Sequence, residues 1–166
     1  MVTMDARLAA NSHQLVVTVH GQPAPQGSKK HVGHGVMVEA SKRLPPWRQA
    51  ICAATAAECE RASFQPAPGG AYGVVAVFTL ARPASHFRRT RDGRRWLKTT
   101  APVAPAVQPD LDKLCRAALD GLADGGALEN DSRVVALAAE KTYPGGHLDA
   151  LDSPGVVLVL TRILGG

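Results

Sequence analysis

Alternating and continuous apolar stretches along the chain predict four β-strands. Residues 15–20 alternate between apolar and polar side chains, which is typical of a strand with one buried face. Three further apolar runs have the length of strands, at residues 72–80, 134–139 and 156–163. Pro and Gly residues precede most of these runs, which favours turns between the strands.

Two other segments repeat apolar residues at helical spacing. The first begins at Pro45 and Pro46, which suit the first turn of a helix, and extends to about Arg61. The second has one apolar face and a stop signal at residues 124–126; the face residues are Leu111, Leu114, Cys115, Ala118 and Leu122. The order of elements predicts an α+β fold of two layers, in which a mixed sheet of about four to five strands packs against two main helices.

Two long segments lack a regular period. Residues 21–35 contain four glycines and two prolines, and a loop is expected there. Residues 81–108 predict a long basic loop between the second strand and the second helix, mobile in the absence of a ligand. Residues 1–166 are expected to form a single domain, with residues 1–12 as a flexible tail.

Composition narrows the class of protein. Hydrophobic residues make up 45% of the chain, which favours a packed core over a disordered chain. No apolar run approaches the roughly 20 residues of a membrane span, and the first residues lack a signal peptide's apolar stretch, so a cytoplasmic location is expected. The cysteines, Cys52, Cys59 and Cys115, have no CxxC spacing, which excludes a disulfide framework and a thiolate zinc site.

Charge is distributed unevenly over a chain whose net charge is +5. Residues 82–98 contain seven basic residues and one acidic residue, whereas residues 110–131 contain six acidic and two basic residues. The first segment would attract a polyanion. Metal-dependent hydrolysis of a phosphodiester needs both kinds of segment, because carboxylates bind the metal and cations neutralise the nucleic-acid backbone.

Asp110 and Asp112 lie at the expected start of the second helix. Asp110 follows a proline and should be extended, so that the two carboxylates project to one side and suit a hard divalent cation. Asp131 precedes a strand that could return past the same helix terminus, which predicts one site of three carboxylates. In a simpler interpretation Asp110 is an N-cap, and Asp120 forms a surface ion pair with Arg116.

Three motifs in this region resemble the signature of the RusA-type Holliday-junction resolvases of phages and prophages. They are Pro109-Asp110-Leu111-Asp112-Lys113-Leu114, Arg116-Ala117-Ala118-Leu119-Asp120-Gly121-Leu122 and Asn130-Asp131-Ser132-Arg133-Val134-Val135. The strong resemblance covers about residues 108–143. A weaker likeness extends to the first strand with its Pro-rich loop and to the strand before the basic segment.

The resemblance implies a homodimer in a bacterial host or a phage-infected cell. Such a dimer would bind four-way DNA junctions and resolve them by paired nicks that depend on Mg²⁺, with Mn²⁺ as a substitute. It also implies that Asp110, Asp112 and Asp131 are catalytic residues that bind the metal. The catalytic lysine of the family falls on Arg116, which stays charged and transfers protons poorly, so that a phosphate clamp is the expected role.

The chain departs from the family pattern at two further positions. Lys113 replaces the usual asparagine, and Asn130 replaces the first residue of the usual aspartate pair. The residues expected to bind DNA are Lys29, Lys30, Arg88, Arg89, Arg91, Arg94, Arg95, Lys98 and Lys113. Phe87 and Trp96 alternate with these arginines and either stack on unpaired bases or pack back on the domain.

Other functions stay open from the sequence. A non-catalytic DNA-binding protein of the same fold would use the basic segment on branched or single-stranded DNA. A related nuclease would cut flaps or forks instead of junctions. His31 and His34 form an HxxH spacing without a nearby cysteine or acidic ligand, so a zinc site is not expected.

Overall fold

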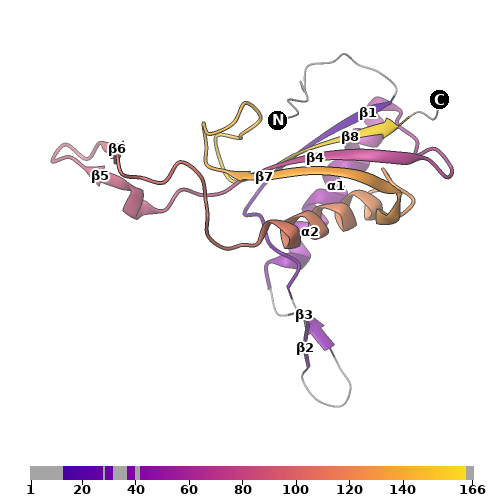
Figure 1. Cartoon of the computed structure of the whole chain (residues 1–166), viewed down its shortest axis with the longest axis horizontal. Coiled ribbons are helices and arrows are strands. Elements are labelled where there is room, and N and C mark those ends of the chain that lie inside the picture. Colours follow the sequence, from indigo (N-terminus) through magenta and orange to yellow (C-terminus); the bar gives the residue numbers. More distant parts are fainter. Residues whose placement is uncertain (1–12, 28, 32–36, 40–41, 164–166) are drawn as a thin grey trace.

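A mixed four-stranded sheet forms the centre of the molecule (Figure 1). The structure is a computed structural model, and it describes residues 13–27, 29–31, 37–39 and 42–163. Across the sheet the strands are β1 (Gln14–His20), β8 (Gly155–Ile163), β4 (Ala71–Thr79) and β7 (Val134–Thr142). β8 pairs antiparallel with both β1 and β4, whereas β4 and β7 are parallel. The predicted α+β class is therefore confirmed.

Two helices, α1 (Leu44–Ala62) and α2 (Leu111–Asp124), cover one face of this sheet (Figure 1). The core between the layers follows the predicted patterns. In β1, Leu15, Val17 and Val19 are buried and alternate with exposed residues. In α2, Leu114 and Leu122 are completely buried. No helix in the described residues is both long and apolar enough to cross a membrane.

The two helices approach each other closely at a glycine. A Cβ atom on Gly121 of α2 would lie 2.6 Å from Cγ2 of Ile51 in α1. One turn later, a Cβ atom on Gly125 would lie 2.5 Å from Cβ of Thr55. Any larger residue at these two positions would therefore push the helices apart.

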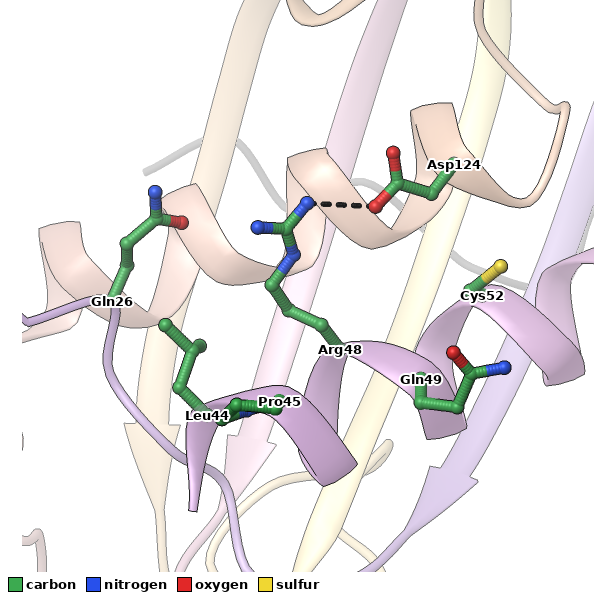
Figure 2. Close-up of a pocket in the computed structure, with 7 residues that line it drawn as sticks. All are labelled: Gln26, Leu44, Pro45, Arg48, Gln49, Cys52 and Asp124. Carbon is green, nitrogen blue, oxygen red and sulfur yellow. Dashed lines mark hydrogen bonds and ion pairs between the residues drawn. The ribbon is translucent and has the colours of Figure 1, made fainter. Parts of the chain in front are cut away.

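An ion pair joins the helices on the side facing solvent. Arg48 Nη2 in α1 lies 2.7 Å from Asp124 Oδ2, and its Nη1 lies 3.7 Å from Asp120 Oδ2. Figure 2 shows Arg48 reaching across to α2. An open groove of about 630 Å³ lies beside it. The predicted pair of Asp120 with Arg116 is wrong, because the packing of α1 on α2 brings Arg48 to Asp120 instead.

Two segments predicted as loops contain short hairpins. β2 (Lys29–His31) pairs antiparallel with β3 (Met37–Glu39), so the prediction of a loop is wrong for residues 29–31. The long basic segment lies where it was predicted, but it contains η1 (Ala84–His86), β5 (Phe87–Arg89) and β6 (Arg95–Leu97). Strands of three residues are too short to show an alternation of apolar and polar side chains, so the sequence did not predict them.

We expect Gly121→Ala to destabilise the protein. The new methyl group would overlap Ile51 at a cost of about 1–3 kcal/mol, more than the roughly 1 kcal/mol by which alanine favours a helix over glycine. Thermal unfolding followed by circular dichroism should show a lower Tm for the variant. An unchanged or higher Tm would contradict the close approach of α1 and α2.

Candidate active site and nucleic-acid interface

The start of α2 presents two exposed carboxylates. Asp110 is the N-cap residue and has the predicted extended backbone, with φ −67° and ψ 137°. Its carboxylate makes no capping hydrogen bond, and its Oδ2 lies 2.8 Å from Nζ of Lys113. The carboxylate of Asp112, in the first turn, has no hydrogen bond or ion pair within the described part of the chain. Helix capping therefore does not account for either carboxylate.

Lys113 controls the charge of Asp110. The hydrogen bond from Lys113 and its positive charge hold the pKa of Asp110 below the usual value, and the charge of Lys141 adds a smaller effect. In return, Asp110 raises the pKa of Lys113. Asp110 is thus ionised at neutral pH. Lys113, which was expected to bind DNA, is the counterion of Asp110 in this structure, and its contact with DNA stays a prediction.

Lys141 holds the segment that leads into α2. It lies near the end of β7, and its Nζ donates hydrogen bonds to the carbonyl oxygens of Val107 at 2.6 Å and Pro109 at 2.9 Å. These bonds fix the backbone immediately before Asp110. Lys141 was not predicted from the sequence, where its signal is a single lysine at the end of an apolar strand.

The base of the basic segment is held by the same end of β7. Tyr143, which is buried, lies one residue beyond β7. The guanidinium of Arg82 stacks 4.1 Å from the centre of its ring, and the ring of His86 meets it edge-on at 5.6 Å. Arg82 also donates to the carbonyl of Pro102 at 2.8 Å. Arg82 is therefore a structural residue, and the basic segment begins beside the acidic pair.

Asp131 lies at the opposite end of the sheet. It belongs to η2 (Asp131–Arg133), just before β7, where Glu129 accepts a hydrogen bond from the amide of Gly69 at 3.3 Å. From Val134 to Lys141 the strand covers roughly 20 Å, at about 3.3 Å per residue. Asp131 is thus separated from the start of α2 by about the length of β7.

The prediction of one three-carboxylate site is therefore wrong for a single chain. In the described ranges, no three His, Cys, Asp or Glu side chains lie close enough to hold a metal ion. The physical reason is the direction of β7, which starts near the end of α2 and finishes near its beginning (Figure 1). Asn130 has a structural role at that far end, because its side-chain oxygen accepts the amide hydrogen of Ser132 at 3.1 Å.

A cationic hairpin, formed by β5 and β6, extends away from the sheet (Figure 1). Arg88 pairs with Trp96, and Arg89 pairs with Arg95, so arginines lie on both faces of the hairpin. All the basic side chains predicted to bind DNA in this segment are exposed; they are Arg88, Arg89, Arg91, Arg94, Arg95 and Lys98. Two arginines directly opposite each other weaken a hairpin, and a bound polyanion would relieve that repulsion.

The two aromatic residues of the hairpin differ in their surroundings. The guanidinium of Arg95 stacks 4.4 Å from the centre of the Phe87 ring. Trp96 has 53% of its surface exposed, although an indole usually packs against the domain. Trp96 is thus the aromatic side chain available for stacking on a base. The other predicted DNA ligands, Lys29 and Lys30, lie in β2.

The family model of endodeoxyribonuclease RusA matches residues 20–148. The chain belongs to the RusA family. No curated protein matches it. The matched region contains the acidic pair, the cationic hairpin, Lys141 and Asp131. RusA proteins are endodeoxyribonucleases, hydrolases that cut inside a DNA strand, and they act on branched DNA.

The acidic pair of this RusA chain fits a hard divalent cation. Mg²⁺ is commonly held by one or two carboxylates, with water and phosphate oxygens completing its octahedron. Asp110 and Asp112 offer exposed carboxylate oxygens, and the amides of the helix N-terminus favour an anionic substrate beside them. Arg116, one turn after Asp112, is exposed and has no ion pair in the described residues.

We expect Lys141→Met to disturb the acidic pair. Loss of the two hydrogen bonds should lower the free energy of unfolding by about 1–2 kcal/mol. Loss of the ammonium charge should raise the pKa of Asp110, which NMR titration of its carboxyl carbon would measure. DNA cleavage should also fall, because the backbone before Asp110 is no longer held.

Arg162→Met is the matched control. Arg162 Nη2 donates to the carbonyl of Gln65 at 2.7 Å, at the end of the sheet away from Asp110. This variant should lose a similar amount of stability and keep its cleavage rate and the pKa of Asp110. Equal effects of the two variants on cleavage would mean that Lys141 contributes to stability alone.

Proposed function

We propose that the protein is a metal-dependent, structure-selective endodeoxyribonuclease that resolves four-way DNA junctions by paired phosphodiester hydrolysis. The observation that carries this proposal is the exposed pair, Asp110 and Asp112, at a helix N-terminus beside a cationic hairpin. Membership of the RusA family supports the reaction class and the branched substrate. A symmetric junction with two cuts suits a homodimer with two equivalent sites.

Asp110 and Asp112 would hold Mg²⁺, or Mn²⁺ in its place. When bound, such an ion stabilises charge on the phosphate and lowers the pKa of an attacking water. Arg116 binds the scissile phosphate through its planar guanidinium, which keeps its charge at every relevant pH and does not transfer a proton. The resemblance makes Asp131 the third catalytic carboxylate, but in this chain it lies at the other end of β7 from Asp110 and Asp112.

The cationic hairpin binds the DNA backbone near the branch. Its arginines neutralise phosphates on both faces, and Trp96 is exposed where it can stack on a base that is unpaired at the junction. Because Arg82, His86 and Tyr143 hold the base of the hairpin next to the end of β7, bound DNA is directed towards the acidic pair.

We expect Asp112→Asn to abolish cleavage and to leave junction binding unchanged or tighter. The change removes a metal ligand and a negative charge near the phosphate, so the cleavage rate should fall by at least about 100-fold. Synthetic four-way junctions, forks, flaps and linear duplexes would be incubated with Mg²⁺ or with EDTA. The unaltered protein should cut the junction in Mg²⁺ alone.

Asp124→Asn is the control, since it removes the same charge from the other end of α2 and, among the residues that the structure describes, breaks the ion pair with Arg48 alone. It should cut at the normal rate. Junction binding without cleavage by the unaltered protein would indicate a non-catalytic DNA-binding protein. Preferential cutting of forks or flaps would mean that these structures, and not four-way junctions, are the substrate. Full activity of Asp112→Asn would remove Asp112 from the catalytic residues.

The salt dependence of junction binding should show whether the arginines of the hairpin contact DNA phosphates. Replacing Arg88 and Arg89 by alanine should weaken junction binding and reduce the slope of log K against log salt by up to about 0.9 for each lost phosphate contact. Arg61→Ala is the control, because Arg61 pairs with Glu58 on α1, at 2.7 Å. A slope unchanged in the double variant would place the hairpin away from the DNA.

A further inference from the structure

We propose that the cationic hairpin is a wedge that inserts between two arms of a branched DNA, with each of its faces against one arm. This inference rests on the proposed function, and it names the element that distinguishes a branched substrate from a linear duplex. Its basis is the distribution of charged and apolar side chains over the two faces and along the length of the hairpin.

The two faces of the hairpin present the same kind of surface. In an antiparallel pair, residues in register lie on one face, and successive residues along a strand alternate between faces. One face therefore presents an apolar pair and then a pair of arginines: Phe87 opposite Leu97, and Arg89 opposite Arg95. The other face has Arg88 opposite Trp96. Each face thus combines arginine with a large apolar side chain that is about half exposed, Leu97 at 48% and Trp96 at 53%.

A single duplex cannot cover both faces of this hairpin. A two-stranded ribbon in a major groove turns one face to the base edges and leaves the other face in water. Here that arrangement would leave either Leu97 or Trp96 in water, together with arginines that have no phosphate to bind. Between two arms, each face meets a separate phosphate backbone. The distribution over both faces therefore favours insertion between arms over binding in the groove of one arm.

The order of side chains from the base of the hairpin to its tip fits the shape of a branch. Phe87 and Leu97 form the pair farthest from the turn, and Trp96 lies next to them. Arg91 and Arg94 lie at the turn. At a branch, the last bases of an arm expose their flat faces, and the phosphates of that arm run outward from there. The apolar base would contact the exposed bases, and the cationic tip would contact the phosphates.

The base of the hairpin is the part nearest to the acidic pair. The amide of Lys98 donates to the carbonyl of His86 at 2.9 Å and closes the base. The ring of His86 meets Tyr143, one residue beyond β7, and Lys141 of β7 holds the segment before α2. A branch that lies at the base of the hairpin is therefore next to the acidic pair, which places the wedge where it can select the cleavage site.

The turn of the hairpin is held by its own hydrogen bonds. The amide of Thr90 donates to the carbonyl of Arg94 at 3.0 Å, and the amide of Gly93 donates to the carbonyl of Thr90 at 3.0 Å. The carboxylate of Asp92 accepts from the hydroxyl of Thr90 and from the amide of Arg94, the latter at 3.4 Å. Gly93 has φ +82°, which glycine adopts without strain. A turn held in this way loses less freedom on binding, as a wedge requires.

Substitutions on the two faces, measured on two DNA substrates, test the wedge. Affinities for a four-way junction and for a linear duplex would be measured in EDTA, so that binding is separate from cleavage. Trp96→Thr and Leu97→Thr change opposite faces, and threonine keeps a high strand propensity. Trp96→Thr should weaken junction binding by roughly 5- to 100-fold, because stacking on a base is lost. Leu97→Thr should weaken it by about 5-fold, and neither variant should change the affinity for the duplex.

Two further variants serve as controls. Trp96→Phe keeps an aromatic ring and should keep most of the affinity for the junction. Val16→Thr is matched to Leu97→Thr, since Val16 is 43% exposed on β1, at the edge of the sheet opposite β7. It should leave both affinities unchanged. The other tryptophan, Trp47, is buried, so fluorescence quenching that the junction causes in the unaltered protein and not in Trp96→Phe reports on Trp96.

The expected result is a loss of junction binding from each face, with Trp96 quenched by the junction and not by the duplex. Equal losses on the junction and on the linear duplex would place the hairpin in the groove of one arm and would overturn the wedge. A loss from one face alone, or Trp96 fluorescence that the junction does not quench, would also overturn it. Failure of the proposed function is a different result, in which the unaltered protein binds the junction selectively but does not cut it in Mg²⁺.

Discussion

The parallel pairing of β4 with β7 sets the positions of the acidic pair, the cationic hairpin and Asp131. Parallel neighbours cannot be joined by a tight turn, so the chain must cross back over the sheet between them. α2 makes that crossing, and it therefore begins at the carboxyl ends of β4 and β7 and finishes at their amino ends. Ligands of α/β units bind at the carboxyl ends of parallel strands, where Asp110 and Asp112 lie. Asp131 begins the returning strand and so lies at the other end.

The same crossover explains why the cationic hairpin is next to the acidic pair. The hairpin is inserted between the end of β4 and the start of α2, a connection that must lie at the carboxyl edge of the sheet. Lys141 and Tyr143 follow in the chain at that edge, where one holds the start of α2 and the other holds the base of the hairpin. The cationic hairpin and the acidic pair are therefore neighbours because of topology, whatever their distance in sequence.

Local signals in the sequence predicted the elements, and their relative directions could not be predicted. The alternation of β1, the prolines in the first turn of α1 and the apolar face of α2 are all confirmed, since each depends on residues within a few positions. The motif also located the acidic pair correctly at the start of α2. The apolar residues of β7 do not indicate whether this strand lies parallel or antiparallel to β4. The expectation that Asp131 returns to Asp110 failed at that point.

Contacts between segments far apart in the sequence are the other feature that could not be predicted. Arg48 reaches Asp120 only because Gly121 lets α1 approach α2, and Lys141 reaches Pro109 only because β7 ends beside the start of α2. In the sequence alone, Arg48 and Lys141 look like ordinary surface cations.

The departures from the family pattern at Lys113 and Arg116 have a common consequence for the proposed chemistry. The ammonium of Lys113 lies 2.8 Å from Oδ2 of Asp110. A divalent cation that binds Asp110 would compete with Lys113 for that carboxylate and would leave a free ammonium beside the substrate phosphate. Arg116 adds a second, permanent positive charge one turn further along α2. In the proposed function, the helix would exchange an internal ion pair for contacts with the metal and the phosphate, so that DNA binding and metal binding at this terminus would favour each other.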